Sequence, residues 1–293
     1  MRTSNRILRG GSALTEAEVA WGIQTVYIPR ENLRFIEEWI QYHLILGAEY
    51  FYLYDNTGSA SLDAGNSIAV NGKNKYGIPV DFSLSDKEVE EIEAEIFKKY
   101  PVKKVKWQPM EGGKIIYGQL AACDHFAETT SVDWCAFIDI DEFLCSPHPI
   151  SEILQGSAVT IYQKKFEDRF HYDTALQITK TFSINTEKWA PKSIIKMKDY
   201  VIGAKSIHNL PSRNLPTCLS MDVLRFNHYN YNRSQHEWLW RNYRHLDKNW
   251  RPRGFPWPWR ANAFQEVFTE NCDLLKEISK KIDYSKFMNV FRA

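Results

Sequence analysis

The sequence lacks the features that mark several specialised classes of protein. Its five cysteines are odd in number and widely spaced, and none forms a Cys-x-x-Cys pair, so neither a zinc knuckle nor a disulfide framework is indicated. The net charge is only +1, which gives no electrostatic reason to expect binding to nucleic acid or to an anionic membrane. Internal repeats and low-complexity tracts are also lacking. These absences favour a reduced, intracellular, globular protein with no nucleic-acid partner.

Long apolar runs are absent as well. Residues 1–18 are polar, without the apolar segment of a secretory signal, and no stretch approaches the length of a membrane-spanning helix. We therefore expect a soluble, cytoplasmic protein with no transmembrane segment. The 293 residues, of which 44% are hydrophobic, suffice for one large α/β domain or two smaller ones with an ample core.

The first part of the chain has the pattern of a parallel sheet. Residues 21–29 alternate and are rich in β-formers, which predicts a first strand that stops at Pro29. An amphipathic helix follows, with Asn32 as its expected N-cap and Gly47 just past its end. Residues 50–54 form a second predicted strand. Strand, helix and strand at this spacing predict a right-handed βαβ unit, and hence parallel strands.

The alternation of helices and strands continues and then changes character. A helix opened by a capping box, a strand and a second helix are predicted over 85–99, 102–107 and 114–129, followed by an acidic strand that opens at Trp134. Shorter strands are predicted at 158–166, 194–197, 201–207 and 223–228, and two closing helices at 234–245 and 264–281. The sequence thus predicts an α/β fold with a mixed, mostly parallel sheet flanked by helices and a more irregular C-terminal half.

Three carboxylates end the apolar run that starts at Trp134. The run contains no Gly or Pro and predicts a strand buried on both faces; Asp139, Asp141 and Glu142 follow. Because side chains alternate along a strand, Asp139 and Asp141 should share one side, with Cα atoms about 6.6 Å apart, while Ile140 points into the protein. Ligands bind at the carboxyl ends of strands in open α/β sheets, so the pair predicts a site for a divalent cation and a ligand hydroxyl. A strand followed by a solvated acidic turn is the alternative.

Several blocks of the chain, in order, resemble glycosyltransferase family 92 and its relatives. The matching blocks are Glu31-Asn32, Glu38-Trp39 with Tyr42-His43, Phe51 to Asn56, Trp134 to Leu144, Lys192 to Ile195 with His208, and Asn227-His228-Tyr229 with Arg233-Ser234 and Glu237. They lie between residues 24 and 241. The family's Asn-Glu order after the first strand appears here as Arg30-Glu31-Asn32, and residues 67–80 and the tail after 251 fit poorly.

The resemblance implies a GT-A, Rossmann-like fold and metal-dependent transfer of a hexose from a nucleotide sugar to a hydroxyl of a glycan or glycoconjugate. A UDP-sugar is favoured as donor, galactose is one candidate sugar, and inversion is the expected stereochemistry. As a single GT-A domain, the chain is expected to divide into a tail (1–20), a nucleotide-sugar-binding half (21–145), an acceptor and metal-completing half (146–250) and a C-terminal helical segment (251–293).

The resemblance also implies a metal centre. Asp141 would bind the cation, Asp139 would serve as a further ligand or face the ribose or a metal-bound water, and His228 would supply an imidazole, with His208 as second candidate. Carboxylate oxygens together with an imidazole suit Mn²⁺ or Mg²⁺, and the nitrogen ligand favours Mn²⁺. Such an ion neutralises charge on the diphosphate leaving group. The alternative for either histidine is an ordinary polar surface position.

Other residues are candidates for contacts with the donor and for the base. Asp55 can accept from a ring N–H of the nucleotide base, or else cap a turn, and Glu31 belongs to a matched block on the donor side. Lys114 follows two glycines at a predicted helix start and can contact phosphate, or else be solvated. Inverting transfer needs a base, for which Glu167 and Asp168 are the candidates, with Glu237 as another. Tryptophans that can stack on sugars, or simply pack, are Trp189, Trp238, Trp240, Trp257 and Trp259.

Two other functions remain open at this point. A nucleotidyltransferase also presents acidic pairs at strand ends to a metal-bound nucleotide, although such enzymes often carry a glycine-rich loop near the first strand, which this sequence lacks. A non-catalytic carbohydrate-binding protein would use the aromatic C-terminal half alone.

Overall fold

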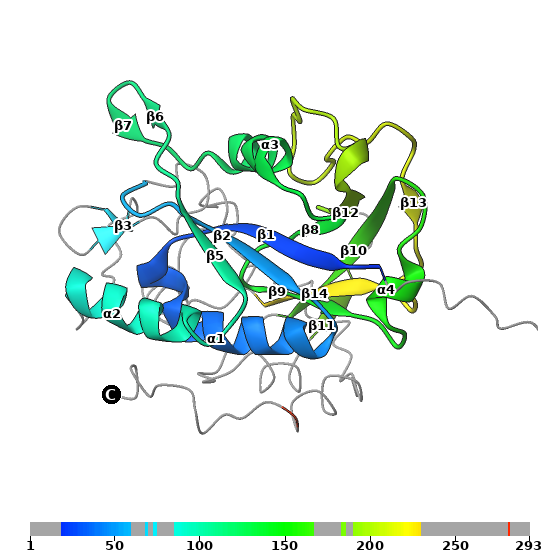
Figure 1. Cartoon of the computed structure of the whole chain (residues 1–293), viewed down its shortest axis with the longest axis horizontal. Coiled ribbons are helices and arrows are strands. Elements are labelled where there is room, and N and C mark those ends of the chain that lie inside the picture. Colours follow the sequence, from blue (N-terminus) through cyan, green and yellow to red (C-terminus); the bar gives the residue numbers. More distant parts are fainter. Residues whose placement is uncertain are drawn as a thin grey trace, which may run out of the picture.

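A computed structural model of the chain describes residues 19–59, 68–69, 73–74, 85–166, 183–185, 190–229 and 281. Four parallel strands form its first half: β1 (Trp21–Tyr27), β2 (Tyr50–Asp55), β5 (Val102–Lys106) and β8 (Trp134–Phe137). They lie in the order β5-β2-β1-β8, so β1 is central (Figure 1). Two short antiparallel pairs stand apart: β3 (Ile68–Ala69) with β4 (Lys73–Asn74), and β6 (Met110–Glu111) with β7 (Lys114–Ile115).

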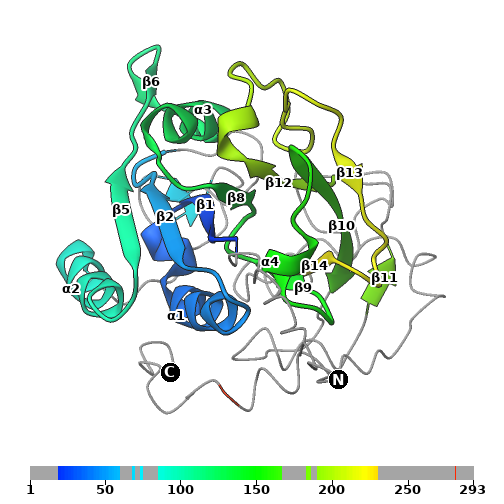
Figure 2. The ribbon, with the colours of Figure 1, turned by 45° about the vertical axis from the view of Figure 1, so that its right-hand side comes forward.

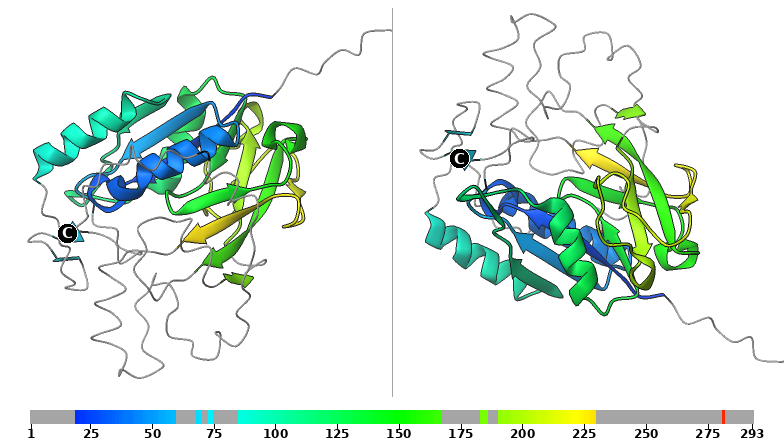
Figure 3. Two further views of the ribbon diagram at one scale, coloured as in Figure 1. Left: turned by 90° about the horizontal axis from the view of Figure 1, so that it is seen from below. Right: turned by 90° about the horizontal axis from the view of Figure 1, so that it is seen from above.

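Helices cover both faces of this parallel part. α1 (Pro29–Ile45) and α2 (Asp86–Phe97) lie on one face and α3 (Gln119–Thr129) on the other (Figure 3). β1 is buried along its whole length because it supplies both layers: Ile23 packs with the α1 side and Val26 with the α3 side. A strand buried on two faces in this way needs apolar residues at nearly every position.

The helix ends agree with the sequence at some positions and differ at others. The Ser85–Glu88 capping box of α2 is present, and Gly47 follows α1 in the left-handed conformation with φ of 94°. The prediction that Asn32 caps α1 was wrong. The helix begins at Pro29, whose missing N–H suits the first helical position, and the Asn32 Oδ1 accepts from the backbone N–H of Ile28 at 2.9 Å.

The helix predicted from Lys114 begins five residues later, at Gln119. Gly112 and Gly113, with φ of 54° and 77°, instead form the turn of the β6–β7 hairpin, and Lys114 lies exposed in β7. Two consecutive residues with positive φ cannot start an α-helix, and they suit a tight hairpin turn.

The second half of the sheet is mixed. β12 (Lys192–Lys196) runs antiparallel to β8, and β10 (Ala158–Phe166) runs antiparallel to β12. β14 (Arg225–Tyr229) is parallel to β10, and β9 (Glu142–Cys145) closes the order as an antiparallel partner of β14. Short strands β11 (Ser183–Asn185) and β13 (Thr217–Cys218) also pair with β10. The remaining short elements are α4 (Ile150–Ile153) and the 3-10 helix η1 (Met197–Asp199).

The strand predicted over 201–207 was wrong. These residues form bends and turns after η1, and Gly203 has a φ of 92°, which interrupts an extended chain. The two apolar residues that suggested a strand, Val201 and Ile202, are 39% and 51% exposed and do not enter the core. Exposed β-branched residues satisfy a sequence pattern without supplying the packing that holds a strand in place.

The sheet curls so that its last strand returns to the first helix. Figure 2 shows β12, β10 and β14 turning away from β1 and β8, which brings β9 toward α1. Side chains of α1 bond the free edge of β9: the Trp39 Nε1–H donates to the Glu142 carbonyl at 2.8 Å, and the Tyr42 hydroxyl donates to the Leu144 carbonyl at 2.6 Å. The helix thus satisfies backbone groups that an edge strand would otherwise leave unpaired.

The fold class predicted from the sequence is confirmed: an α/β protein with a mixed, largely parallel sheet flanked by helices, consistent with a GT-A, Rossmann-like fold. One hydrophobic cluster runs from Trp21 in β1 to Phe226 in β14. The predicted division of the chain into segments stays a prediction. The helix predicted over 234–245 lies outside the described residues, as does that over 264–281 except for Lys281, which is helical. Within the described residues, no helix is both long and apolar enough to cross a membrane.

Candidate active site

Asp139 and Asp141 lie in a turn between β8, which ends at Phe137, and β9, which begins at Glu142. The chain turns because β8 pairs with β1 and β12, whereas β9 must reach β14. Two hydrogen bonds close the turn: the Glu142 N–H donates to the Asp139 carbonyl at 3.0 Å, and the Asp139 N–H donates to the Glu142 Oε2 at 2.8 Å. The expected alternation survives, because Ile140 is buried while the side chains of Asp139 and Asp141 are 32% and 37% exposed.

The turn lies at the carboxyl edge of the parallel strands. β1 is parallel to both β8 and β2, and its last residue, Tyr27, pairs in register with Asp55 at the end of β2. Asp55 and the turn after β8 therefore project from the same edge. In open α/β sheets this edge is where ligands bind.

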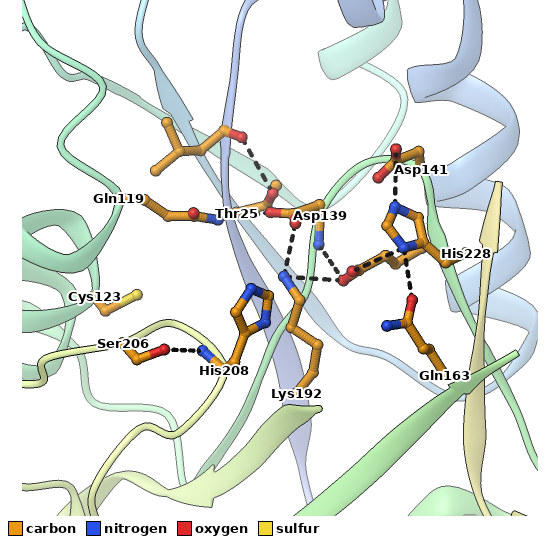
Figure 4. Close-up of polar contacts among 12 residues, drawn as sticks. Thr25, Gln119, Cys123, Asp139, Asp141, Gln163, Lys192, Ser206, His208 and His228 are labelled. Atoms are coloured by element: carbon orange, nitrogen blue, oxygen red, sulfur yellow. Dashed lines mark hydrogen bonds and ion pairs between the residues drawn. The ribbon is translucent and has the colours of Figure 1, made fainter. Parts of the chain in front are cut away.

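Lys192 is buried against the acidic turn, and its ammonium contacts Asp139 and Glu142. It is the first residue of β12 and its side chain is 1% exposed. Its ammonium lies 2.7 Å from the Asp139 Oδ2 and 3.2 Å from the Glu142 Oε2, as Figure 4 shows for Asp139. The other oxygen of Asp139, Oδ1, accepts a hydrogen bond from the Gln119 Nε2 at 2.6 Å. Both carboxylate oxygens of Asp139 thus have protein partners.

These contacts set the charges of the cluster. Burial alone would raise the pKa of Asp139, but the Lys192 ammonium and its hydrogen bond hold that pKa below its usual range. Burial, opposed by Lys192 and reinforced by the charge of Asp139, raises the pKa of Glu142 to about 7. Burial works against the charge of Lys192, yet the two carboxylates raise its pKa above the ordinary value. Lys192 and Asp139 are therefore a charged pair at neutral pH.

His228 reaches the acidic turn from β14, where it pairs in register with Glu142 of β9. Its Nε2 lies 3.3 Å from the Asp141 Oδ2, and its Nδ1 lies 2.9 Å from the Gln163 Oε1 of β10 (Figure 4). The imidazole is 21% exposed. The structure thus brings Asp139, Asp141 and His228 together, as the resemblance implies. His208 takes a different place, beside Lys192, whose charge adds to burial in lowering the pKa of His208.

The contacts of His228 indicate which of its two ring nitrogens carries a proton. An amide oxygen at Nδ1 calls for the N–H on that nitrogen, which leaves the Nε2 lone pair of a neutral imidazole facing the carboxylate of Asp141. Two acceptors at 3.3 Å repel each other unless a proton or a cation lies between them. A proton on Nε2 or a bound cation would each remove this repulsion.

Asp55 has the turn-cap contacts that the sequence offered as its alternative role. Its Oδ1 accepts from the Thr57 backbone N–H at 2.9 Å and from the Thr57 hydroxyl at 2.5 Å. Its Oδ2 lies 2.9 Å from the Lys104 ammonium, and Lys104 also contacts the buried Glu93. A contact between Asp55 and a nucleotide base stays a prediction.

The remaining predicted site residues are not joined to this cluster by the described contacts. Lys114 lies exposed in the β6–β7 hairpin and not at a helix start. Glu31 falls within α1, but its side chain lies outside the described ones. Glu167 and Asp168 follow β10 and lie outside the described residues, as do Glu237 and the five C-terminal tryptophans considered above. Their roles stay predictions.

Sequence reasoning missed three side chains of the site. It gave no role to Gln119 or Gln163, and placed Lys192 only in a matched block. One signal was available for Lys192, because a lysine that opens the apolar run Ser193-Ile194-Ile195 has a charge to bury and so needs a carboxylate partner. Nothing along the chain marks the two glutamines, since both act through residues far away in sequence.

The donor set fits a divalent ion bound by few protein ligands. In the described part of the chain, no group of three or more His, Cys, Asp or Glu side chains is arranged to hold a metal ion. Asp141 and His228 offer one oxygen and one nitrogen 3.3 Å apart, comparable with the separation of about 3 Å between neighbouring ligands of an octahedral Mg²⁺ site. Such ions commonly take one or two protein ligands and complete their shell with water and substrate phosphates.

Comparison with known proteins gives only distant likeness. No known protein family and no curated protein matches the sequence. Among solved structures, S. aureus TarS (residues 1–349) is similar at 10% identity and a TM-score of 0.38, over 72% of this chain and 61% of that one. Glucosyl-3-phosphoglycerate synthase from Mycobacterium tuberculosis, solved with Mn²⁺, UDP and glucosyl-3-phosphoglycerate, is similar at 17% identity and a TM-score of 0.25, over 55% of this chain and 50% of that one.

A third similar structure is a UDP-glucose pyrophosphorylase complexed with UDP-glucose, at 13% identity and a TM-score of 0.26, over 62% of this chain and 71% of that one. Likeness at these levels does not carry an activity over to the present chain. The chain also spans only 61% of the TarS chain solved, which comprises residues 1–349. Membership of glycosyltransferase family 92 stays a prediction, and the function has to be argued from the site itself.

Proposed function

We propose that this protein is a metal-dependent glycosyltransferase of GT-A type, which moves a hexose from a nucleotide sugar to a hydroxyl of a glycan or glycoconjugate. A UDP-sugar is the favoured donor, with galactose as one candidate sugar. The observation that carries the proposal is the meeting of Asp141 and His228, 3.3 Å apart, at the carboxyl edge of the parallel strands. Two acceptors from distant parts of the chain face each other there, and a cation bound between them would remove their repulsion.

The residues of the site divide the work of binding a nucleotide sugar. Asp141 and His228 would hold Mn²⁺ or Mg²⁺, and Gln163 orients the imidazole so that Nε2 faces the ion. When bound, the ion neutralises the charge that gathers on the diphosphate as the glycosidic bond breaks. Asp139, held by Lys192 and Gln119, would act one step away from the ion, toward the ribose or a bound water. Asp55, at the end of β2, would lie on the nucleotide side.

An inverting transfer also needs a base for the acceptor hydroxyl. We propose Glu167 or Asp168, which follow directly on β10 after its last residue, Phe166. Gln163 of the same strand contacts His228. The two carboxylates therefore follow a residue of the site by four and five positions in the sequence. Substituting each by its amide would test this role, because loss of the base lowers turnover while leaving donor binding intact.

A donor screen tests the proposed function. The protein is incubated with a panel of UDP- and GDP-sugars and MnCl₂, and released nucleotide is measured. We expect slow Mn²⁺-dependent hydrolysis of at least one donor, lost on chelation with EDTA. Asp141→Ala should abolish this release while keeping the melting temperature, because Asp141 is half-exposed and its loss leaves no buried group unpaired. Full activity in D141A would contradict the assignment.

The same screen separates the alternative functions. Release of pyrophosphate from a nucleoside triphosphate and a sugar phosphate would indicate a nucleotidyltransferase instead. An absence of turnover with every donor, together with binding to glycans, would indicate a carbohydrate-binding protein. Gln41→Leu serves as the control for D141A and should keep full activity. Gln41 is in α1, and its amide donates to the Tyr100 hydroxyl at 2.6 Å, away from the acidic turn.

A further inference from the structure

Lys192 of β12 is a buried cation that lies against the acidic turn. Its side chain is 1% exposed and pairs with Asp139 and Glu142, both of which belong to the acidic turn. A buried ion pair seldom stabilises a fold more than apolar side chains of similar size would, because removing two charges from water is costly. β12 otherwise presents apolar residues to the core at Ile194 and Ile195. A lysine at this position therefore calls for a reason other than stability.

The contacts of Asp139 suggest that reason. The Lys192 ammonium takes the Oδ2 at 2.7 Å and the Gln119 amide takes the Oδ1 at 2.6 Å. The two donors come from different sides, Lys192 from β12 and Gln119 from the first turn of α3, as Figure 4 shows. A carboxylate held at both oxygens keeps one orientation. Each oxygen keeps a second lone pair, so a carboxylate held in this way can still accept a hydrogen bond from a ligand.

We propose that Lys192, together with Gln119, is a positioning residue of the donor site. It fixes the carboxylate of Asp139 toward the nucleotide. This inference rests on the proposed function, since it supposes that a metal-bound nucleotide occupies the edge of the sheet. It assigns the two aspartates separate tasks: Asp141 serves the ion, and Asp139, through Lys192, serves the nucleotide.

The variant that tests this is Lys192→Met combined with Glu142→Gln. Methionine keeps most of the volume of lysine, and the second change removes one of the two carboxyl groups that pair with the ammonium, so that fewer buried carboxylates lose their partner. Glutamine retains an oxygen that can accept from the Asp139 N–H, which Glu142 bonds at 2.8 Å. The matched control is Lys198→Met, which removes an exposed lysine of η1 outside the acidic turn.

Two affinities are measured for each protein: Mn²⁺ alone, and UDP or GDP in the presence of saturating Mn²⁺. In K192M/E142Q we expect Mn²⁺ affinity to be retained and nucleotide affinity to fall about 10- to 100-fold. A loss of this size is usual when a residue that orients a ligand-binding side chain is removed. K198M should keep both affinities. Unchanged nucleotide affinity in a folded K192M/E142Q would overturn the inference. So would a parallel loss of Mn²⁺ affinity, because Lys192 would then support the turn as a whole.

A second variant tests the inference if K192M/E142Q fails to fold, which the absence of a cooperative unfolding transition would show. Gln119→Leu removes the other donor to Asp139 and leaves the charged cluster intact, and it should weaken nucleotide binding while retaining Mn²⁺ affinity. No effect of Q119L on nucleotide affinity would overturn the inference by itself. If the unsubstituted protein binds neither nucleotide with Mn²⁺, the proposed function fails and the inference falls with it.

Discussion

Gln163 controls which nitrogen of His228 faces the acidic turn. Its amide oxygen lies 2.9 Å from Nδ1, so Nε2 is the nitrogen left to face Asp141. Metal-binding histidines are usually oriented in this way by a hydrogen bond to their other nitrogen. The tautomer of His228, and with it the ability of the site to bind a cation, depends on a residue that no sequence motif marks.

Gln163→Leu should weaken the binding of Mn²⁺ about 10- to 100-fold, because an imidazole that is no longer oriented spends less time with Nε2 toward the ion. Electron paramagnetic resonance of free Mn²⁺ gives the affinity directly. Gln41→Leu, another partly buried glutamine, is expected to bind Mn²⁺ like the unsubstituted protein. Equal affinities in all three proteins would show that Gln163 does not orient the ligand.

At the scale of elements, side chains of α1 hydrogen-bond the backbone along the outer edge of β9. Alongside the bonds from Trp39 and Tyr42, the Leu144 N–H donates to the His43 Nε2 at 3.2 Å, and the His43 Nδ1–H donates to the Trp39 carbonyl at 2.8 Å. His43 is fully buried, and both of its ring nitrogens take part in these hydrogen bonds. The helix thereby holds the strand that directly follows the acidic turn.

This arrangement predicts a loss of stability in acid. Burial lowers the pKa of His43 from 6.5 to about 3, so below pH 6.5 the unfolded chain takes up a proton that the folded chain excludes. The contribution of His43 is thus intact above pH 6.5 and declines as the pH falls toward 3. Between pH 7 and pH 5 the free energy of unfolding should drop by about 2 kcal/mol from this group.

Urea denaturation at several pH values measures that slope. The non-titrating variant His43→Gln should be less stable at pH 7, because it loses part of the hydrogen bonding to β9. Its stability should nevertheless fall less steeply between pH 7 and pH 5. A slope as steep as that of the unsubstituted protein would assign the acid sensitivity to other groups.

At the scale of the whole molecule, the site depends on the curl of the sheet. The acidic turn follows β8, Lys192 comes from β12, and Gln163 and His228 come from β10 and β14, so the parallel part and the mixed part of the sheet meet there. The large hydrophobic cluster likewise includes side chains from both halves. A ligand at this site would therefore stabilise the molecule as one unit.

We accordingly expect Mn²⁺ and a bound nucleotide to raise the midpoint of a single thermal unfolding transition. At a ligand concentration of 100 times the dissociation constant, binding to the folded state adds about 2.7 kcal/mol, enough to shift the midpoint by several degrees. D141A should show no shift. Two separate transitions, only one of which responds to ligand, would contradict the expectation that the halves unfold together.

Part of the fold and site followed from the sequence because it is encoded locally. Hydrophobic periodicity marked the βαβ entry, the Ser85–Glu88 capping box marked the start of α2, and alternation predicted that Ile140 is buried between two more exposed aspartates. These features depend on residues within a few positions of one another. Where two local patterns competed, the prediction failed, as at Lys114, where the glycine turn of a hairpin overrode the expected helix start.

The sequence by itself determined the acidic residues, their place at a strand end and the parallel entry to the sheet, because propensity and side-chain periodicity act along the chain. Only the tertiary structure decided that His228 and not His208 meets Asp141, that Lys192 lies buried beneath Asp139, and that a second strand, β9, follows the acidic turn. Those contacts join residues 50 to 90 positions apart. They follow from the order in which β12, β10, β14 and β9 extend the sheet, which is set by the packing of the whole core and by no short stretch of sequence.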